Sequence, residues 1–191
     1  MSKKLGFAIS GSFCTFQNIL VAMSELVQAG YELIPIFSYI VAETDTRFFK
    51  AKDFRSEVRH ITGREPIDSI VDAEPLGTRD KLDLMVVAPC TGNTLSKIAH
   101  GITDTPITMA VKAHLRNNRP VLISLSSNDA LGANAKNLGT LLNTKNIFFV
   151  PFGQDNPEVK TRSLIADTVQ ILPAIEAAME GRQLQPLFCR L

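Results

Sequence analysis

The sequence predicts an α/β fold, in which a doubly wound parallel sheet carries helices on both faces. Segments with strand character alternate with segments of helical periodicity along the whole chain. The strand-like segments are unbroken apolar runs, which is typical of parallel strands buried on both faces. Right-handed crossovers between such strands produce the doubly wound arrangement. Because 191 residues suffice for one core of this kind, we expect a single domain spanning 1–191.

The first part of the chain shows a strand–helix–strand–helix pattern. The apolar run 5–9 ends in Ser-Gly-Ser, which predicts a buried strand followed by a turn. Apolar residues recur at helical spacing in 16–29, and the glycine that follows is typical of a helix end. The run 31–37 predicts the second strand, and 47–61 carries a helical pattern that also closes at a glycine.

The middle of the chain contains the clearest strand. The segment 66–80 holds two prolines and a glycine, so we expect irregular structure with one short element at 67–71. The run 82–88, LDLMVVA, predicts a strand buried on both faces. The segments 91–100 and 105–115 predict two helices, the first of which ends before a glycine.

The last third continues the alternation. We expect strands at 121–125 and 147–150, with a helix at 130–142 between them. A final helix is predicted over 157–179, with a kink at Pro173. The complete pattern indicates a Rossmann- or flavodoxin-like sheet.

Composition excludes several classes of protein. The net charge is +1 with both signs mixed along the chain, so we expect no nucleic-acid partner. The three cysteines are far apart and suggest a reducing, cytoplasmic compartment, and the three histidines lack metal-ligand spacing, so no metal is expected. The N-terminus has no signal-peptide pattern and no apolar run is long enough for a bilayer, so no membrane association is expected.

Four predicted strands are followed by loops rich in hydroxyl and amide side chains. Ligands of such sheets bind beyond the carboxyl ends of the strands, where these loops meet. Small hydroxyl residues and the N–H groups of helix N-termini form a phosphate site without an obligatory lysine. The loops are Ser10-Gly11-Ser12-Phe13, Ser38-Tyr39, Pro89-Cys90-Thr91-Gly92-Asn93-Thr94 and Ser126-Ser127-Asn128.

The glycine pattern favours a mononucleotide at this edge. The first loop has one glycine and lacks GxGxxG, and the chain has no GxxxxGK[ST] motif. Taken singly, these side chains have ordinary structural explanations. Ser12 and Thr91 are more often helix caps, Asn93 and Asn128 more often turn residues, and Phe13 more often core. Their convergence on one edge favours a ligand site.

A longer motif carries a family resemblance. The stretch 88–104, APCTGNTLSKIAHGITD, is similar to the APATANTIAKIANGIAD signature of the FMN-dependent flavoprotein family, which includes phosphopantothenoylcysteine decarboxylases, peptidyl-cysteine decarboxylases and flavin prenyltransferases. The residues 11–13 resemble the first FMN-phosphate loop of that family. The segment 126–128, followed by Asn134 and Asn137, is similar to its P-x-M-N…N…NL segment.

The resemblance extends over about 3–180 and implies FMN as the cofactor. It also implies contacts between FMN and specific side chains, with hydroxyl groups near the phosphate and ribityl chain and the start of a helix near the flavin. These residues are Gly11, Ser12, Phe13, Ser38, Thr91, Gly92, Asn93, Thr94 and Ser126.

Three residues differ from the family pattern, and these differences argue against two of its activities, cysteine decarboxylation and flavin prenyl transfer. Where the cysteine decarboxylases carry a histidine, this sequence has Pro75, which is unable to act as a general base. Ser127 replaces their methionine. Ser126 stands where flavin prenyltransferases place an arginine.

Details at 64–67 and 74–80 are most similar to one branch of the family, found in spore-forming bacteria, whose members work with a second, different chain. This resemblance implies oxidation of a dihydropyridine precursor to pyridine-2,6-dicarboxylate in the mother-cell cytoplasm. It also implies a partner chain that resembles a Rossmann dehydrogenase and carries NAD(P). Three classes stay open: part of an oxidoreductase complex, another FMN-family enzyme, and a non-catalytic flavin-binding protein.

The implied substrate is a dianion, so cations and amides near the site are candidate contacts. We predict substrate contacts for Lys97, Arg79 and Asn128, although residues such as Lys97 and Arg79 are more often solvated or interface charges. The family resemblance also implies a homo-oligomer, a trimer or a dodecamer. The apolar pair at 48–49 and the tail at 186–188 are candidate contacts between copies.

Overall fold

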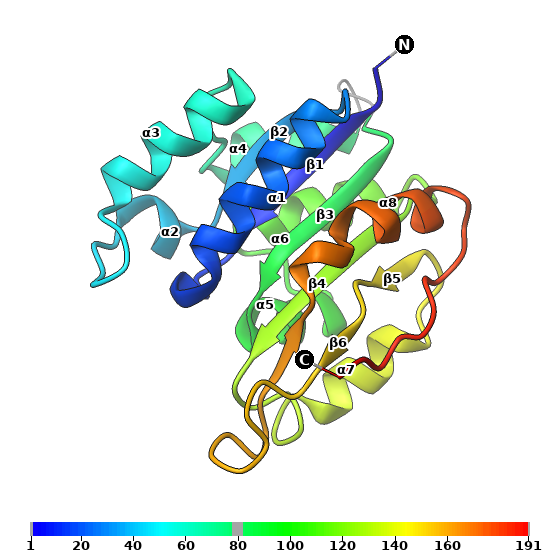
Figure 1. Ribbon diagram of the computed structural model, residues 1–191. Coiled ribbons are helices and arrows are strands. Elements are labelled where there is room, and N and C mark those ends of the chain that lie inside the picture. The colour runs from blue at the N-terminus through cyan, green and yellow to red at the C-terminus, as the bar shows by residue number, and fades with distance from the viewer. Residues whose placement is uncertain (1, 78–81, 191) are drawn as a thin grey trace.

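The computed structural model describes residues 2–77 and 82–190, and its centre is a sheet of seven strands (Figure 1). The strand order is β2-β1-β3-β4-β7-β6, and β5 pairs with the first half of β4. The strands are β1 (Lys4–Ile9), β2 (Glu32–Phe37), β3 (Leu84–Cys90), β4 (Val121–Ser127), β5 (Ile147–Phe149), β6 (Phe152–Gly153) and β7 (Leu164–Ala166).

The sheet is mixed, which differs from the purely parallel sheet predicted. Strands β1 to β5 pair in parallel, whereas β7 runs antiparallel to both β4 and β6. The second half of β4 therefore has a different neighbour from its first half. This change of neighbour brings the β6–β7 loop to the carboxyl end of β4.

Helices cover both faces of the sheet, as predicted. In Figure 1, α1 and α8 lie on one face and α6 lies behind the other. The α-helices are α1 (Phe16–Gln28), α2 (Tyr39–Glu43), α3 (Ala51–Thr62), α4 (Ile70–Ala73), α5 (Gly92–Ala99), α6 (Pro106–Leu115), α7 (Ala135–Leu142) and α8 (Ile171–Met179). Short 3-10 helices are η1 (Phe13–Thr15), η2 (Glu74–Gly77) and η3 (Thr168–Gln170).

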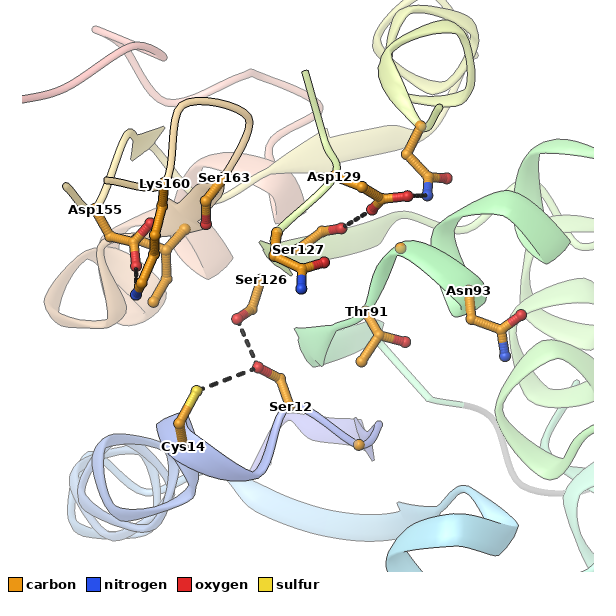
Figure 2. Close-up of a pocket in the computed structure, with 15 residues that line it drawn as sticks. Ser12, Cys14, Thr91, Asn93, Ser126, Ser127, Asp129, Asp155, Lys160 and Ser163 are labelled. Carbon is orange, nitrogen blue, oxygen red and sulfur yellow. Dashed lines mark hydrogen bonds and ion pairs between the residues drawn. The ribbon is translucent and has the colours of Figure 1, made fainter. Parts of the chain in front are cut away.

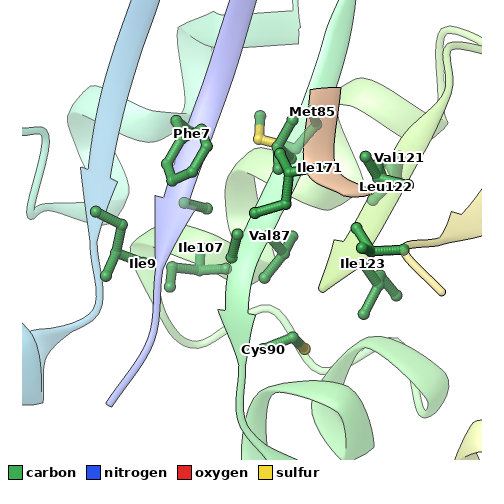
Figure 3. Close-up of a cluster of buried hydrophobic side chains, with 14 of the residues drawn as sticks. Phe7, Ile9, Met85, Val87, Cys90, Ile107, Val121, Leu122, Ile123 and Ile171 are labelled. Carbon is green, nitrogen blue, oxygen red and sulfur yellow. The ribbon is translucent and has the colours of Figure 1, made fainter. Parts of the chain in front are cut away.

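The core lies between the sheet and these two helical layers. Every residue of β3 is buried, because its apolar side chains alternate between the two covered faces. Ile107 of α6 and Ile171 of α8 are also buried and pack with the strand side chains (Figure 3). Each fully buried aliphatic side chain of this size stabilises the fold by roughly 1.5–3 kcal/mol.

The helix predicted over 157–179 is wrong in its first half. That stretch contains β7 and η3, and only α8 is an α-helix. Pro173 is the third residue of α8 and therefore lies in its first turn. The predicted kink there is wrong, because proline in a first turn removes no intrahelical hydrogen bond.

Several other boundaries differ from the prediction. Helix α3 begins at Ala51 rather than 47, because the preceding residues form a turn in which Asp45 Oδ1 accepts from the Ala51 N–H at 2.9 Å. Helix α7 begins five residues later than predicted, after a run of turns. The short element predicted at 67–71 is α4, followed by η2, and α2 was not predicted. Among the described residues, every helix falls short of what a bilayer span requires.

Candidate functional site

A cavity of about 550 Å³ opens at the carboxyl edge of the sheet (Figure 2). Its wall comes from the loops after β1, β3 and β4 and from the β6–β7 loop. The lining residues are mostly small and polar: Gly11, Ser12, Cys14, Thr91, Gly92, Asn93, Ser126, Ser127, Asn128, Asp129, Asn134, Asp155, Lys160, Ser163 and Ile165. This volume lies within the range of roughly 300–1,000 Å³ that holds small organic ligands.

Hydroxyl hydrogen bonds join the loops that form the floor of the cavity. The Ser12 and Ser126 hydroxyls are 2.7 Å apart and link the loop after β1 to the end of β4. Behind them, the buried Ser10 hydroxyl donates to the Pro89 carbonyl at 2.7 Å and accepts from the Thr91 N–H at 2.9 Å. The three loops are therefore held together before any ligand binds.

The N-terminus of α5 forms one side of the cavity. The Thr91 hydroxyl caps this helix by accepting from the Thr94 N–H at 3.3 Å. The first N–H groups of a helix have no partner within the helix, and its dipole adds partial positive charge there. Gly92 and Asn93, the first two helical residues, line the cavity. This arrangement suits an anion.

A partly buried polar network supports the same helix end from the β4 side. Asp129 accepts from the Ser127 hydroxyl at 2.5 Å and from the Asn134 amide at 2.8 Å, so both of its oxygens have donors. A Cβ on Gly92 would lie 2.6 Å from both the Ser127 hydroxyl and the Asn134 amide nitrogen. The glycine therefore allows α5 to approach this network closely.

The β6–β7 loop supplies an ion pair on the opposite side of the cavity. Lys160 Nζ donates to Asp155 Oδ2 at 2.6 Å. The hydrogen bond to Asp155 raises the pKa of Lys160. Partial burial acts to raise the pKa of Asp155, but Lys160 and the nearby Ser163 hydroxyl outweigh it and hold that pKa below its ordinary value. Both side chains are therefore charged at neutral pH.

The structure brings seven of the predicted site residues to the cavity wall. They are Gly11, Ser12, Thr91, Gly92, Asn93, Ser126 and Asn128. These residues come together because the strands that precede them end at the same edge of the sheet, as expected. That they contact a ligand stays a prediction.

Three predicted cofactor residues lie outside the wall. Thr94 is buried behind the Thr91 cap, and the Phe13 ring packs on Phe16 with centroids 5.1 Å apart. Ser38 is also buried, and its hydroxyl has no hydrogen-bond partner among the described residues.

The predicted substrate cations are not part of the wall. Lys97 Nζ pairs with Asp104 Oδ1 at 2.7 Å, away from the cavity. Arg79 lies outside the described residues. Their roles in substrate binding stay predictions without a position in the site.

Sequence reasoning missed the residues of the β6–β7 loop. The stretch predicted as a helix contains or adjoins Asp155, Lys160 and Ser163. Because no strand was predicted there, nothing in the sequence indicated that these residues lie at the edge of the sheet. Cys14 was also missed; it is exposed and lies two residues after Ser12. None of the three histidines lines the described cavity wall.

Comparison with known proteins agrees with the resemblance in the α5 segment. The model of the family described as Flavoprotein matches residues 1–178. The chain belongs to the flavoprotein family. Within it, the chain is 48% identical to the B subunit of dipicolinate synthase from Bacillus subtilis (strain 168), over 97% of this chain and 92% of that relative.

Solved structures give the same relationship. The crystal structure of the dipicolinate synthase B subunit from Bacillus halodurans C superposes with a TM-score of 0.91 at 44% identity, covering 100% of this chain and 99% of that one. A dodecameric FMN-dependent UbiX-like decarboxylase from Escherichia coli O157:H7 superposes with a TM-score of 0.62 at 19% identity, covering 78% and 79% of the two chains. The second likeness shows the fold alone.

Proposed function

We propose that this chain is the FMN-binding component of a dipicolinate synthase. In this role it takes part in oxidising a dihydrodipicolinate-type precursor to dipicolinate during sporulation. The observation that carries the proposal is the polar cavity against the N-terminus of α5, in a chain 48% identical to the B subunit of a dipicolinate synthase. Membership of the flavoprotein family supports the choice of a flavin cofactor.

The residues present fit FMN. The α5 N-terminus and the Ser12 and Ser126 hydroxyls form a donor set suited to a phosphate. The Ser38 hydroxyl is buried and has no partner among the described residues, although buried polar groups are ordinarily satisfied. This unsatisfied hydroxyl stands at the end of β2, at the same edge of the sheet as the cavity, where a polar ligand group would supply its partner. When bound, the flavin supplies an acceptor of two electrons.

The chain's own residues bind and orient. Thr91 holds the first turn of α5 in place, and Gly92 lets the Asp129 network approach its backbone. The amides of Asn93 and Asn128 offer donors and acceptors to the polar edge of a flat ring.

A partner and further copies complete the proposal. From the resemblance to dipicolinate synthase, we expect the partner to be the A subunit and to carry NAD(P). We expect this chain to assemble as a trimer or dodecamer and to work in the cytoplasm of the mother cell.

Another FMN-family activity is the alternative. A cysteine decarboxylase or flavin prenyltransferase would act without a partner on a peptidyl cysteine or a prenyl phosphate. The described cavity wall has no histidine, and Ser126 and Ser127 stand where those enzymes carry arginine and methionine. These features favour the oxidoreductase assignment.

The test is reconstitution of the two chains with the precursor, followed by the ultraviolet absorbance of dipicolinate. We expect product only when both chains and FMN are present, and a rate at least about tenfold lower for Asn93→Leu, which removes polar contacts in the site. If an Asn93→Leu chain that has lost FMN supports the full rate, this chain is a non-catalytic member of the complex.

A further inference from the structure

The two sides of the cavity differ in charge. Around Thr91 and Asn93 the described wall carries the helix dipole and one carboxylate, that of Asp129, whereas the β6–β7 loop carries an ion pair (Figure 2). Lys160 is the one cationic side chain among the described lining residues, and about half of its side chain is exposed (55%). The ammonium has three N–H donors, so its bond to Asp155 leaves two available.

The two carboxylates in the cavity wall, Asp129 and Asp155, differ in the hydrogen bonds that their oxygens accept. Both oxygens of Asp129 already accept hydrogen bonds, so this side chain is structural. In Asp155, Oδ2 accepts from Lys160, whereas Oδ1 is buried and has no hydrogen-bond partner among the described residues. The carboxylate torsion is soft, and a rotation turns an oxygen toward the cavity. The Ser163 hydroxyl lies near this carboxylate, but each oxygen has two lone pairs, so Asp155 retains capacity for a further hydrogen bond next to the available donors of Lys160.

We propose that the Asp155–Lys160 pair is a substrate subsite that recognises a ring N–H group and the carboxylate attached to the neighbouring ring carbon. This proposal rests on the proposed function and names the residues that select its substrate. Asp155 accepts a hydrogen bond from the ring N–H, and Lys160 donates to the carboxylate. The two ligand groups are adjacent, as are the two side chains.

This subsite distinguishes reduced from aromatic rings. A dihydropyridine with a protonated ring nitrogen presents a donor to Asp155. The aromatic product presents the lone pair of its pyridine nitrogen, which a carboxylate repels. The subsite therefore binds the N–H form more tightly and favours release of the aromatic form.

The same ammonium would also suit the phosphate of FMN. The arrangement of the cavity favours the ring ligand, because the α5 N-terminus already offers an anion site on the opposite side. Measuring the affinities for FMN and for dicarboxylates separately distinguishes the two sources of negative charge.

The experiment is calorimetric titration of the FMN-loaded full chain with two flat dicarboxylates. One is pyridine-2,6-dicarboxylate, and the other is 4-pyridone-2,6-dicarboxylate, which carries a ring N–H. We expect the pyridone to bind about tenfold more tightly, since its N–H bonds to a charged acceptor. Asp155→Asn reduces that ratio to about twofold or less, because the acceptor loses its charge.

Lys160→Met provides an independent variant, since its exposed side chain tolerates substitution. We expect it to weaken both dicarboxylates about tenfold while FMN affinity stays within about twofold. Glu180→Gln, which removes a carboxylate from the Glu180–Arg182 pair outside the cavity, is the matched control and changes neither ligand.

An unchanged pyridone preference in a folded Asp155→Asn chain overturns the proposal. So does a Lys160→Met chain that loses FMN but keeps its dicarboxylate affinity, which assigns Lys160 to the phosphate. A wild-type chain that retains FMN but binds neither dicarboxylate overturns the subsite and leaves the flavin assignment intact. If the wild-type chain retains no FMN either, the proposed function fails as well.

Discussion

His114 is a buried titratable residue that the cavity does not use. It lies in α6 with 1% of its surface exposed. Burial lowers its pKa to about 4, and the nearby Arg119 acts in the same direction, while the Pro120 backbone and Asp83 oppose the shift. The imidazole is therefore neutral in the folded protein at neutral pH.

This burial makes the free energy of unfolding depend on pH. Because the folded pKa lies below the ordinary value of 6.5, the unfolded chain takes up the proton first as pH falls. The stabilisation is present above pH 6.5 and is lost as pH falls through about 4. Between pH 7 and pH 5, we expect His114 to account for a loss of about 2 kcal/mol.

Urea unfolding at pH 7 and pH 5 measures this loss. His114→Leu removes the titrating group, so its stability should fall by about 2 kcal/mol less than that of the wild type. His60→Gln, a change at an exposed residue of α3, should leave the wild-type dependence intact. An identical drop for His114→Leu and the wild type contradicts the assignment.

At the scale of elements, the N-terminus of α5 depends on a close approach at Gly92. An added methyl group would lie 2.6 Å from the Ser127 hydroxyl and 2.7 Å from Asp129 Oδ1. Gly92→Ala should therefore lower the free energy of unfolding by about 1–3 kcal/mol and weaken FMN binding. Thermal unfolding and flavin titration measure both effects.

Gly139 provides the matched control within α7. A Cβ at Gly139 meets nothing within 4 Å, so Gly139→Ala should stabilise the helix by up to about 1 kcal/mol. If Gly92→Ala behaves like Gly139→Ala, the contact between α5 and the Asp129 network is not tight.

The strands of the central sheet could be predicted because their apolar runs are unbroken and are bounded by turn residues. The segments at 5–9 and 121–125 lie in strands, as predicted, and the predicted strand at 82–88 lies in β3 from Leu84 onward. Strand β7 could not be predicted from the sequence, because its three-residue apolar run is equally compatible with a helix and a strand. Its state is decided by pairing with β4, about 40 residues away in the sequence, which local periodicity does not reveal.

The same dependence on pairing between distant segments explains which residues of the candidate site could be predicted. Ser12, Thr91 and Ser126 were predicted to converge because parallel strands end at one edge, and they do line one cavity. Asp155 and Lys160 reach that cavity only through the antiparallel β6–β7 pair. Lys97 was nominated for its place in the signature helix, but its side chain pairs with Asp104 instead.

At the scale of the whole molecule, exposed apolar side chains favour association. Phe188 is 70% exposed and Phe48 is 44% exposed. With a net charge of +1 there is little repulsion between copies. We expect light scattering at micromolar concentration to give the mass of a trimer or dodecamer, and Phe188→Ser to shift it toward smaller species. A monomer for the wild type would contradict this expectation.

The cavity at the carboxyl edge of the sheet is the proposed site of FMN, and every other role proposed for this chain depends on it. The most direct test is the visible absorption spectrum of the purified chain, as isolated and after incubation with FMN and desalting. We predict a retained flavin band that is lost when Ser12 and Asn93 are both replaced by apolar residues. A chain that retains no flavin under either condition, or a double variant that retains it fully, would contradict the assignment of this cavity to FMN.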